Sequence, residues 1–221
     1  MPCLLHQKYS DQNVTFVYQP GVNSRIVVVL ACPGENEKAL GFPASGETGT
    51  RLCRIIEKMR QIDKDKYGAI CLRNVCVVNA SANVHDSSSQ IRKDDITLNA
   101  CLKSALLKTS GFPRRLILLF GQHAIWAYKF LACKYQIEGD SVVRFCHIGQ
   151  RATKGIEGLD KNQMIDHIAE FFVKCDKSPG EYGWNEFRDV VKGARWENAP
   201  RWLFKNSQSL GLWNLKSGAQ N

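Results

Sequence analysis

The chain has 221 residues, and its 44% hydrophobic and 23% charged residues are ordinary for a globular protein with one substantial core. The formal net charge of +9 favours a polyanionic partner, because Lys and Arg release condensed counterions when they bind phosphates. Neither a signal-peptide pattern nor a run of about 18 apolar residues occurs, so the sequence predicts a cytoplasmic protein without a membrane anchor.

Apolar runs alternate with helical patterns along most of the chain, which is typical of a mostly parallel sheet covered on both faces. The predicted elements, in chain order, are a strand at Arg25–Leu30, a helix at Gly49–Ile62, a strand at Asn74–Asn79, a helix at Lys93–Leu107, a strand at Leu116–Phe120, a helix following Gly121, a strand at Val142–Cys146 and a helix at Lys161–Lys174. This order predicts an α/β fold, a three-layer α/β/α sandwich with a central, mostly parallel four-stranded sheet.

The last part of the chain differs in character from the rest. Residues 176–221 hold four of the five tryptophans among Lys, Arg and Asn residues, namely Trp184, Trp196, Trp202 and Trp213. We therefore expect a domain at 1–175 and a Trp-rich basic C-terminal extension at 176–221 that packs on it. Stacking of these rings on nucleic-acid bases is the alternative interpretation.

The nine cysteines are scattered through apolar runs, which predicts free thiols in a reducing compartment. Cys71 and Cys76 form a Cx4C pair and Cys101 follows, but no fourth ligand has a suitable spacing. No GxxxxGK[ST] or GxGxxG motif occurs, and Ser45 and Ser81 lack a GxSxG context. The sequence thus predicts neither a metal nor a small-molecule cofactor.

Polar or tightly turned segments follow each predicted strand, where a parallel sheet places its ligands. The first strand leads into Ala31, Cys32, Pro33, Gly34 and Glu35, and the second ends at Asn79. The third leads into Gly121, and the fourth leads into His147. We expect Asn79 and His147 to converge on one ligand above the loop that follows the first strand.

The spacing of the first loop, VVVLACPGENEKALGFPASGETGTRL at 27–52, resembles the first motif of the uracil-DNA glycosylase superfamily, especially its family-4 form. The resemblance extends over about 27–155 and includes the Asn-bearing strand end and the His-bearing last loop. It implies a base-flipping DNA glycosylase in which Asn79 reads the edge of the extruded base and His147 stabilises the departing base. The iron-sulfur cluster of family 4 is not expected, since only Cys3 lies near the N-terminus.

Because this chain departs from the family pattern at two positions, a different residue is expected to activate the water. Ala31 and Cys32 occupy the positions that carry acidic or amide residues in the family, so Glu37 is the expected catalytic carboxylate, with Glu35 and Asp86 as reserves. Glu37 as a simple loop cap is the alternative.

The pocket walls also depart from the family. Ala44 stands where family 4 stacks uracil on Phe, which implies a wider pocket unless Phe42 moves in. The expected substrate-binding residues are Cys32, Pro33, Gly34, Glu35, Phe42, Ala44, Ser45 and Asp86, and the expected DNA contacts are Gln150, Arg151 and Lys154.

These residues predict a monomeric, monofunctional DNA glycosylase that removes a flipped, bulky modified pyrimidine and leaves an abasic site. A base that the host's own DNA lacks would suit antiviral defence against phages with modified DNA. Ordinary uracil-excision repair and a non-catalytic DNA-binding module remain as alternatives, the second because positions 31 and 32 lack acidic side chains.

Overall fold

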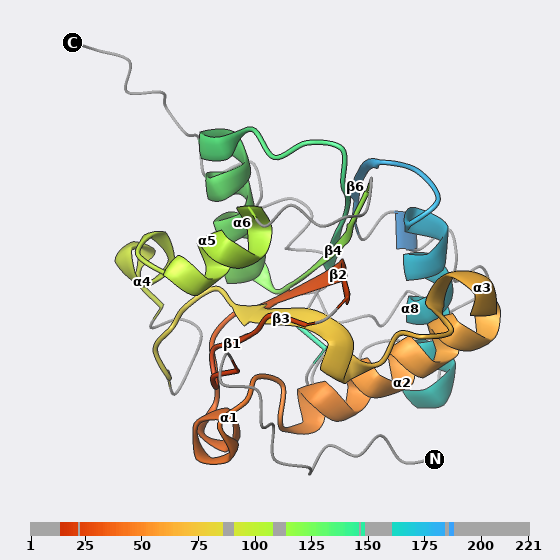
Figure 1. Ribbon diagram of the computed structural model, residues 1–221, viewed down its shortest axis with the longest axis horizontal. Coiled ribbons are helices and arrows are strands. Elements are labelled where there is room, and N and C mark those ends of the chain that lie inside the picture. Colours follow the sequence, from red (N-terminus) through yellow and green to blue (C-terminus); the bar gives the residue numbers. More distant parts are fainter. Residues whose placement is uncertain are drawn as a thin grey trace, which may run out of the picture.

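The computed structural model describes residues 14–21, 23–85, 91–107, 114–145, 147–148, 161–183 and 186–187. These residues form one mixed sheet between two helical layers, as Figure 1 shows. The predicted α/β class and the three-layer arrangement are confirmed. The sheet, however, has six strands instead of four.

The strands follow the order β1-β3-β2-β4-β5-β6 across the sheet. Their bounds are β1 Tyr18–Gln19, β2 Asn23–Leu30, β3 Val75–Asn79, β4 Leu116–Phe120, β5 Ser141–Phe145 and β6 Gly180–Tyr182. All neighbours pair in parallel except β1, which runs antiparallel to β3. The two unexpected strands are the sheet's edges, and at two and three residues they are too short for a sequence period to reveal them.

Two buried clusters separate the layers. One lies between the sheet and α2 (Glu47–Ile62) and α8 (Lys161–Cys175), and the other between the sheet and α5 (Ala100–Leu107) and α6 (Gln122–Tyr135). The remaining helices are α1 Glu35–Leu40, α3 Lys64–Tyr67, the short 3-10 helix η1 Leu72–Asn74 and α4 Lys93–Thr97. The central strands are buried on both faces, which explains their continuous apolar sequences.

The helix predicted over Lys93–Leu107 is two helices, α4 and α5, with a break at Leu98 and Asn99. The Asn99 side chain causes the break, because its Oδ1 accepts the N–H of Leu102, 3.1 Å away, at the start of α5. Its Nδ2 donates to the carbonyls of Asn79 (2.8 Å) and Ala80 (3.0 Å). Asn99 therefore ties the start of α5 to the end of β3.

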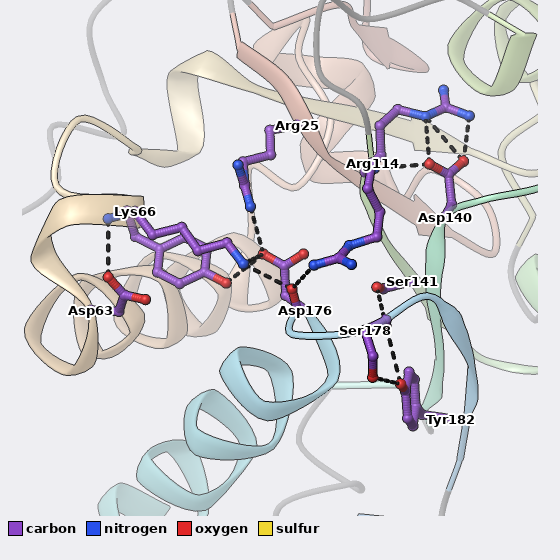
Figure 2. A network of polar contacts seen from close by, with 11 residues as sticks. Arg25, Asp63, Lys66, Arg114, Asp140, Ser141, Asp176, Ser178 and Tyr182 are labelled. Carbon is purple, nitrogen blue, oxygen red and sulfur yellow. Dashed lines mark hydrogen bonds and ion pairs between the residues drawn. The ribbon is translucent and has the colours of Figure 1, made fainter.

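A polar network at the amino ends of the strands centres on Asp176, which is fully buried (Figure 2). Its Oδ2 accepts the hydroxyl of Tyr67 and lies 2.9 Å from Lys66 Nζ and 3.4 Å from Arg25 Nη2. Its carbonyl oxygen accepts Arg114 Nη2 at 2.6 Å. The network joins the ends of β2, α3, β4 and α8, on the side of the sheet opposite to the carboxyl ends of the parallel strands.

Some of the described residues after Cys175 belong to the sheet or to the core. Asp176 is buried, β6 pairs with β5, and Phe187 packs fully buried against Phe145 with ring centroids 5.1 Å apart. The sheet thus continues beyond the predicted boundary at 175. The tryptophans of the expected extension, Trp184, Trp196, Trp202 and Trp213, lie outside the described residues.

Candidate active site

The strand order has a reversal that marks a ligand crevice. From β2 the chain moves to β3 on one side and then crosses to β4 on the other, so β2 and β4 are neighbours with connections that leave in opposite directions. Open α/β sheets bind ligands outside the carboxyl ends of such strands. The segments that leave these ends are Ala31–Gly34 and Gly121–His123.

The glycine-rich loop after β2 forms the short helix α1 and the start of α2. Gly34 precedes α1, and its N–H donates to Glu37 Oε2 at 2.9 Å. Glu37 thus caps this helix, and it is half-buried. Glu35 is exposed in the first turn of the same helix. The capping role that the sequence left open for Glu37 is present, and it fixes the carboxylate beside the loop.

The second half of the loop is held by a close backbone approach. Ala44 has a left-handed φ of 54°, and a Cβ at Gly49 would lie 1.6 Å from the Ala44 carbonyl oxygen, so Gly49 is required there. Phe42, Pro43 and Ser45 are buried around it. Ser45 Oγ is buried without a hydrogen-bond partner. Ala44 itself is fully buried in the cluster under α2, so its small side chain faces the core.

Asn79 has the most unusual environment of the expected site residues. It is 0% exposed, and its Oδ1 is buried without a hydrogen-bond partner. Its Nδ2 lies 3.5 Å from the Phe16 carbonyl, at the limit of a hydrogen bond. The backbone is fixed from both sides, because the N–H donates to Val17 (2.9 Å) and the carbonyl accepts Asn99 Nδ2 (2.8 Å). A rigid backbone therefore holds an amide oxygen that lacks a hydrogen-bond partner.

Arg51 connects the first loop to the loop after β5. It is buried on α2, its Nη1 donates to the Ile148 carbonyl at 2.7 Å, and its Nη2 pairs with Glu47. His147 is exposed, and a Cβ on Gly121 would lie 3.9 Å from the His147 Cβ. The end of β4, the start of α2 and His147 are therefore neighbours.

Two environmental effects lower the pKa of His147 below its usual 6.5. Protein atoms around the imidazole disfavour its charged form, and the nearby Arg51 guanidinium adds repulsion. The ring is thus held neutral at neutral pH, and a neutral imidazole can donate one hydrogen bond to a developing negative charge.

A group of polar side chains after the carboxyl end of β3 was not expected from the sequence. Ser81 is fully buried after β3, and its Oγ lies 3.2 Å from His85 Nε2. The same Nε2 lies 3.6 Å from Asp95 Oδ2. A hydrolase triad needs the two ring nitrogens to face different partners, so this geometry does not make Ser81 a nucleophile. The only sequence signal was the four-residue spacing of Ser81 and His85 after a strand.

Cys32, in the first loop, interacts with Glu37 and with the backbone of His85. Burial raises the pKa of its thiol, the Glu37 carboxylate raises it further, and a hydrogen bond from the His85 backbone opposes the shift. A protonated thiol is a poor nucleophile, so Cys32 contributes a neutral wall to the site. Glu37 and His85 therefore both lie near Cys32, at the same crevice.

Four expected residues lie outside the described part of the chain: Asp86, Gln150, Arg151 and Lys154. Among the residues that the structure does describe, no three His, Cys, Asp or Glu side chains group as metal ligands would, and no disulfide joins cysteines. No helix in this described part is long and apolar enough to cross a membrane.

Comparison with known proteins gives no independent assignment. No protein-family model matches the chain, and no curated protein matches it. The site's own geometry and the motif resemblance are therefore the observations on which a function rests.

Proposed function

We propose that this protein is a monofunctional DNA glycosylase that hydrolyses the N-glycosidic bond of a flipped, modified pyrimidine. The buried, unpartnered amide oxygen of Asn79 at a strand tip beside the strand-order reversal carries the proposal. An extruded pyrimidine presents a donor and acceptor edge that an amide can read. The motif spacing around the first loop supports the same assignment.

Besides base reading by Asn79, the proposed reaction assigns one task each to Glu37 and His147. Water attacks the sugar C1′, the C1′–N bond breaks, and its electron pair leaves with the base. Glu37 orients the water and accepts its proton, and its Gly34 hydrogen bond fixes its position. His147, held neutral, donates a hydrogen bond to the base as negative charge develops there.

The size of the base is the part of this proposal that rests on the motif alone. Ala44 replaces the family's stacking Phe, but it faces the core, and Phe42 is buried nearby in the chain. We propose a bulky 5-substituted pyrimidine, a base that would confine the enzyme's action to modified genomes such as those of some phages. A uracil-repair enzyme is the competing substrate assignment.

A direct test measures base release from matched duplex and single-stranded oligonucleotides containing uracil or a bulky 5-substituted cytosine. Release of the bulky base followed by alkali-sensitive strand breakage is expected, and release of uracil alone would reassign the protein to uracil repair. Glu37→Gln, Asn79→Ala and His147→Ala should each slow release by about 100-fold or more. Glu57→Gln, an exposed carboxylate of α2, is the matched control that should retain activity.

A non-catalytic DNA-binding module is the second candidate, and one observation favours it. Glu37 already accepts a backbone hydrogen bond as a helix cap, which is a sufficient structural reason for its presence. That module would bind the same oligonucleotides without releasing any base. The base-release assay thus separates the two candidates, because DNA binding is common to both.

A further inference from the structure

A cavity of about 310 Å³ is lined by residues at α4 and at the start of α6. These helices lie on the face of the sheet that also carries α5 (Figure 1). Its lining residues are Ile91, Arg92, Lys93, Ile96, Gln122, His123 and Trp126. This volume is at the lower end of the range for small-ligand sites. None of the residues assigned above to base reading or hydrolysis lines it.

The cavity lies beside the proposed active site. Gln122 and His123 directly follow the carboxyl end of β4, where the strand order reverses. His123 is close enough to His85 for their charges to interact, and the His85 backbone in turn contacts the Cys32 sulfur. A nucleic-acid strand with one nucleotide in the active site would therefore have its next nucleotides within reach of the cavity.

The walls combine an aromatic face with positive charge. Trp126 is half-buried and stacks on Phe130, with ring centroids 5.6 Å apart and planes 16° apart, so its ring is held in one orientation. Ile91 and Ile96 are buried apolar groups. Arg92 and Lys93 are exposed at the rim.

None of the described residues that line the cavity is acidic. Asp94 and Asp95 adjoin lining residues in the sequence; Asp94 is exposed, and Asp95 is engaged. Asp95 accepts the Arg92 N–H at 2.8 Å and the Asn83 amide at 2.7 Å. The combination of a fixed aromatic ring with adjacent cations matches a nucleobase and its phosphate.

We propose that this cavity binds a second nucleobase, that of a nucleotide next to the flipped one on the same strand. The base packs between Trp126 and the isoleucines, and its phosphate lies at Arg92 and Lys93. This inference rests on the proposed function, because it takes a DNA strand as the substrate. It extends that function by adding a contact to a nucleobase other than the excised one. Because this neighbouring base must be unpaired to enter the cavity, the contact favours strands in which it is unpaired.

The test is a coupling experiment between protein and DNA variants. A series of single-stranded 15-nucleotide oligonucleotides, each with an abasic tetrahydrofuran at one position near the target base, is titrated against wild type and Trp126→Ala. Loss of a stacked base should weaken wild-type binding about 10-fold at one flanking position. Trp126→Ala should bind intact DNA about 10-fold more weakly than wild type does. Its affinity should not fall further when the oligonucleotide is abasic at that flanking position. A merely structural role of Trp126 would weaken binding equally for every oligonucleotide.

The charged rim has its own readout. Arg92→Gln with Lys93→Gln should reduce the slope of log affinity against log salt by about 1 to 2, since two phosphate contacts are at stake. The matched control is Arg60→Gln with Lys64→Gln, which removes two exposed cations from the end of α2 and from α3. An unchanged slope in the Arg92 and Lys93 variant would overturn the phosphate assignment.

Failure of this inference and failure of the proposed function give different results. If wild type releases a base but no flanking position couples to Trp126, the second nucleobase site is wrong and the glycosylase stands. If coupling appears without base release, the site stands and the catalytic proposal fails. If the protein binds no DNA, the inference is overturned. It is also overturned if sedimentation shows a dimer that Trp126→Ala abolishes, because the cavity then has another occupant.

Discussion

Asn79 has a backbone fixed by hydrogen bonds and a side-chain oxygen without a hydrogen-bond partner. A substitution there can therefore affect stability and the proposed function differently. A buried polar atom without a partner costs about 1 to 3 kcal/mol. We predict that Asn79→Leu, which is similar in size, keeps or raises the free energy of unfolding by up to ~2 kcal/mol while base release is lost. Urea unfolding and the base-release assay measure the two effects.

Asn99 is the matched control for this prediction, since it is a buried amide whose side chain is fully engaged. Asn99→Leu should lower the free energy of unfolding by about 2 kcal/mol or more, because it removes three hydrogen bonds and leaves buried carbonyls without donors. Equal destabilisation by both substitutions would show that the Asn79 amide is structural.

His123 predicts a pH dependence of stability. Burial and the charge of His85 lower the pKa of its ring below 6.5 in the folded protein. The unfolded chain therefore binds more protons than the folded chain below pH 6.5, and this contribution to stability is lost as the pH falls from about 6.5 through the lower folded pKa. His123→Gln should lose less stability than wild type between pH 7.5 and 5, as measured by urea unfolding at each pH. A constant difference across this range would contradict the shift.

At the scale of the elements, α2 and the loop after β5 act together through Arg51. Arg51→Met removes the donor to the Ile148 carbonyl and the positive charge near the neighbouring His147. We predict an unfolding free energy lower by about 1 to 3 kcal/mol, slower base release and a pKa of His147 that rises toward 6.5. An NMR titration of the imidazole measures the last effect.

The exposed neighbour Arg54 provides the control, because Arg54→Met removes a cation from the same helix without touching that loop. It should leave both the His147 titration and base release unchanged. A His147 pKa that is the same in Arg51→Met as in wild type would mean that the protein atoms around the imidazole alone lower it.

The elements also show what the sequence could predict. The four long strands were found because apolar residues dominate each of them, and α2 and α6 because their apolar residues recur at helical spacing. The break between α4 and α5 was missed, because it depends on the Asn99 side chain and on carbonyls 19 and 20 residues away. The His85 group was missed for the same reason, since Asp95 reaches it from another element. Contacts between distant residues leave no local pattern in a sequence.

At the scale of the whole molecule, the two ends of the parallel strands differ in role. The proposed site lies at their carboxyl ends. The Asp176 network, in which three cations converge on one buried residue, stabilises their amino ends (Figure 2). This network connects β2, α3, β4 and the segment before β6. If the proposed function is right, this separation allows stability and catalysis to be changed independently.

We predict that Asp176→Asn lowers the free energy of unfolding by about 3 kcal/mol, because it removes the negative charge that faces Arg25 and Lys66 in a buried position. Base release at 25 °C, well below the unfolding transition, should match wild type, since the carboxyl ends of the strands are untouched. Asp166→Asn is the control: its ion pair with Lys58 is partly exposed and should contribute less than ~1 kcal/mol. If Asp176→Asn slowed base release in a fully folded protein, the amino ends of the strands would be coupled to the site and the division of roles would be wrong.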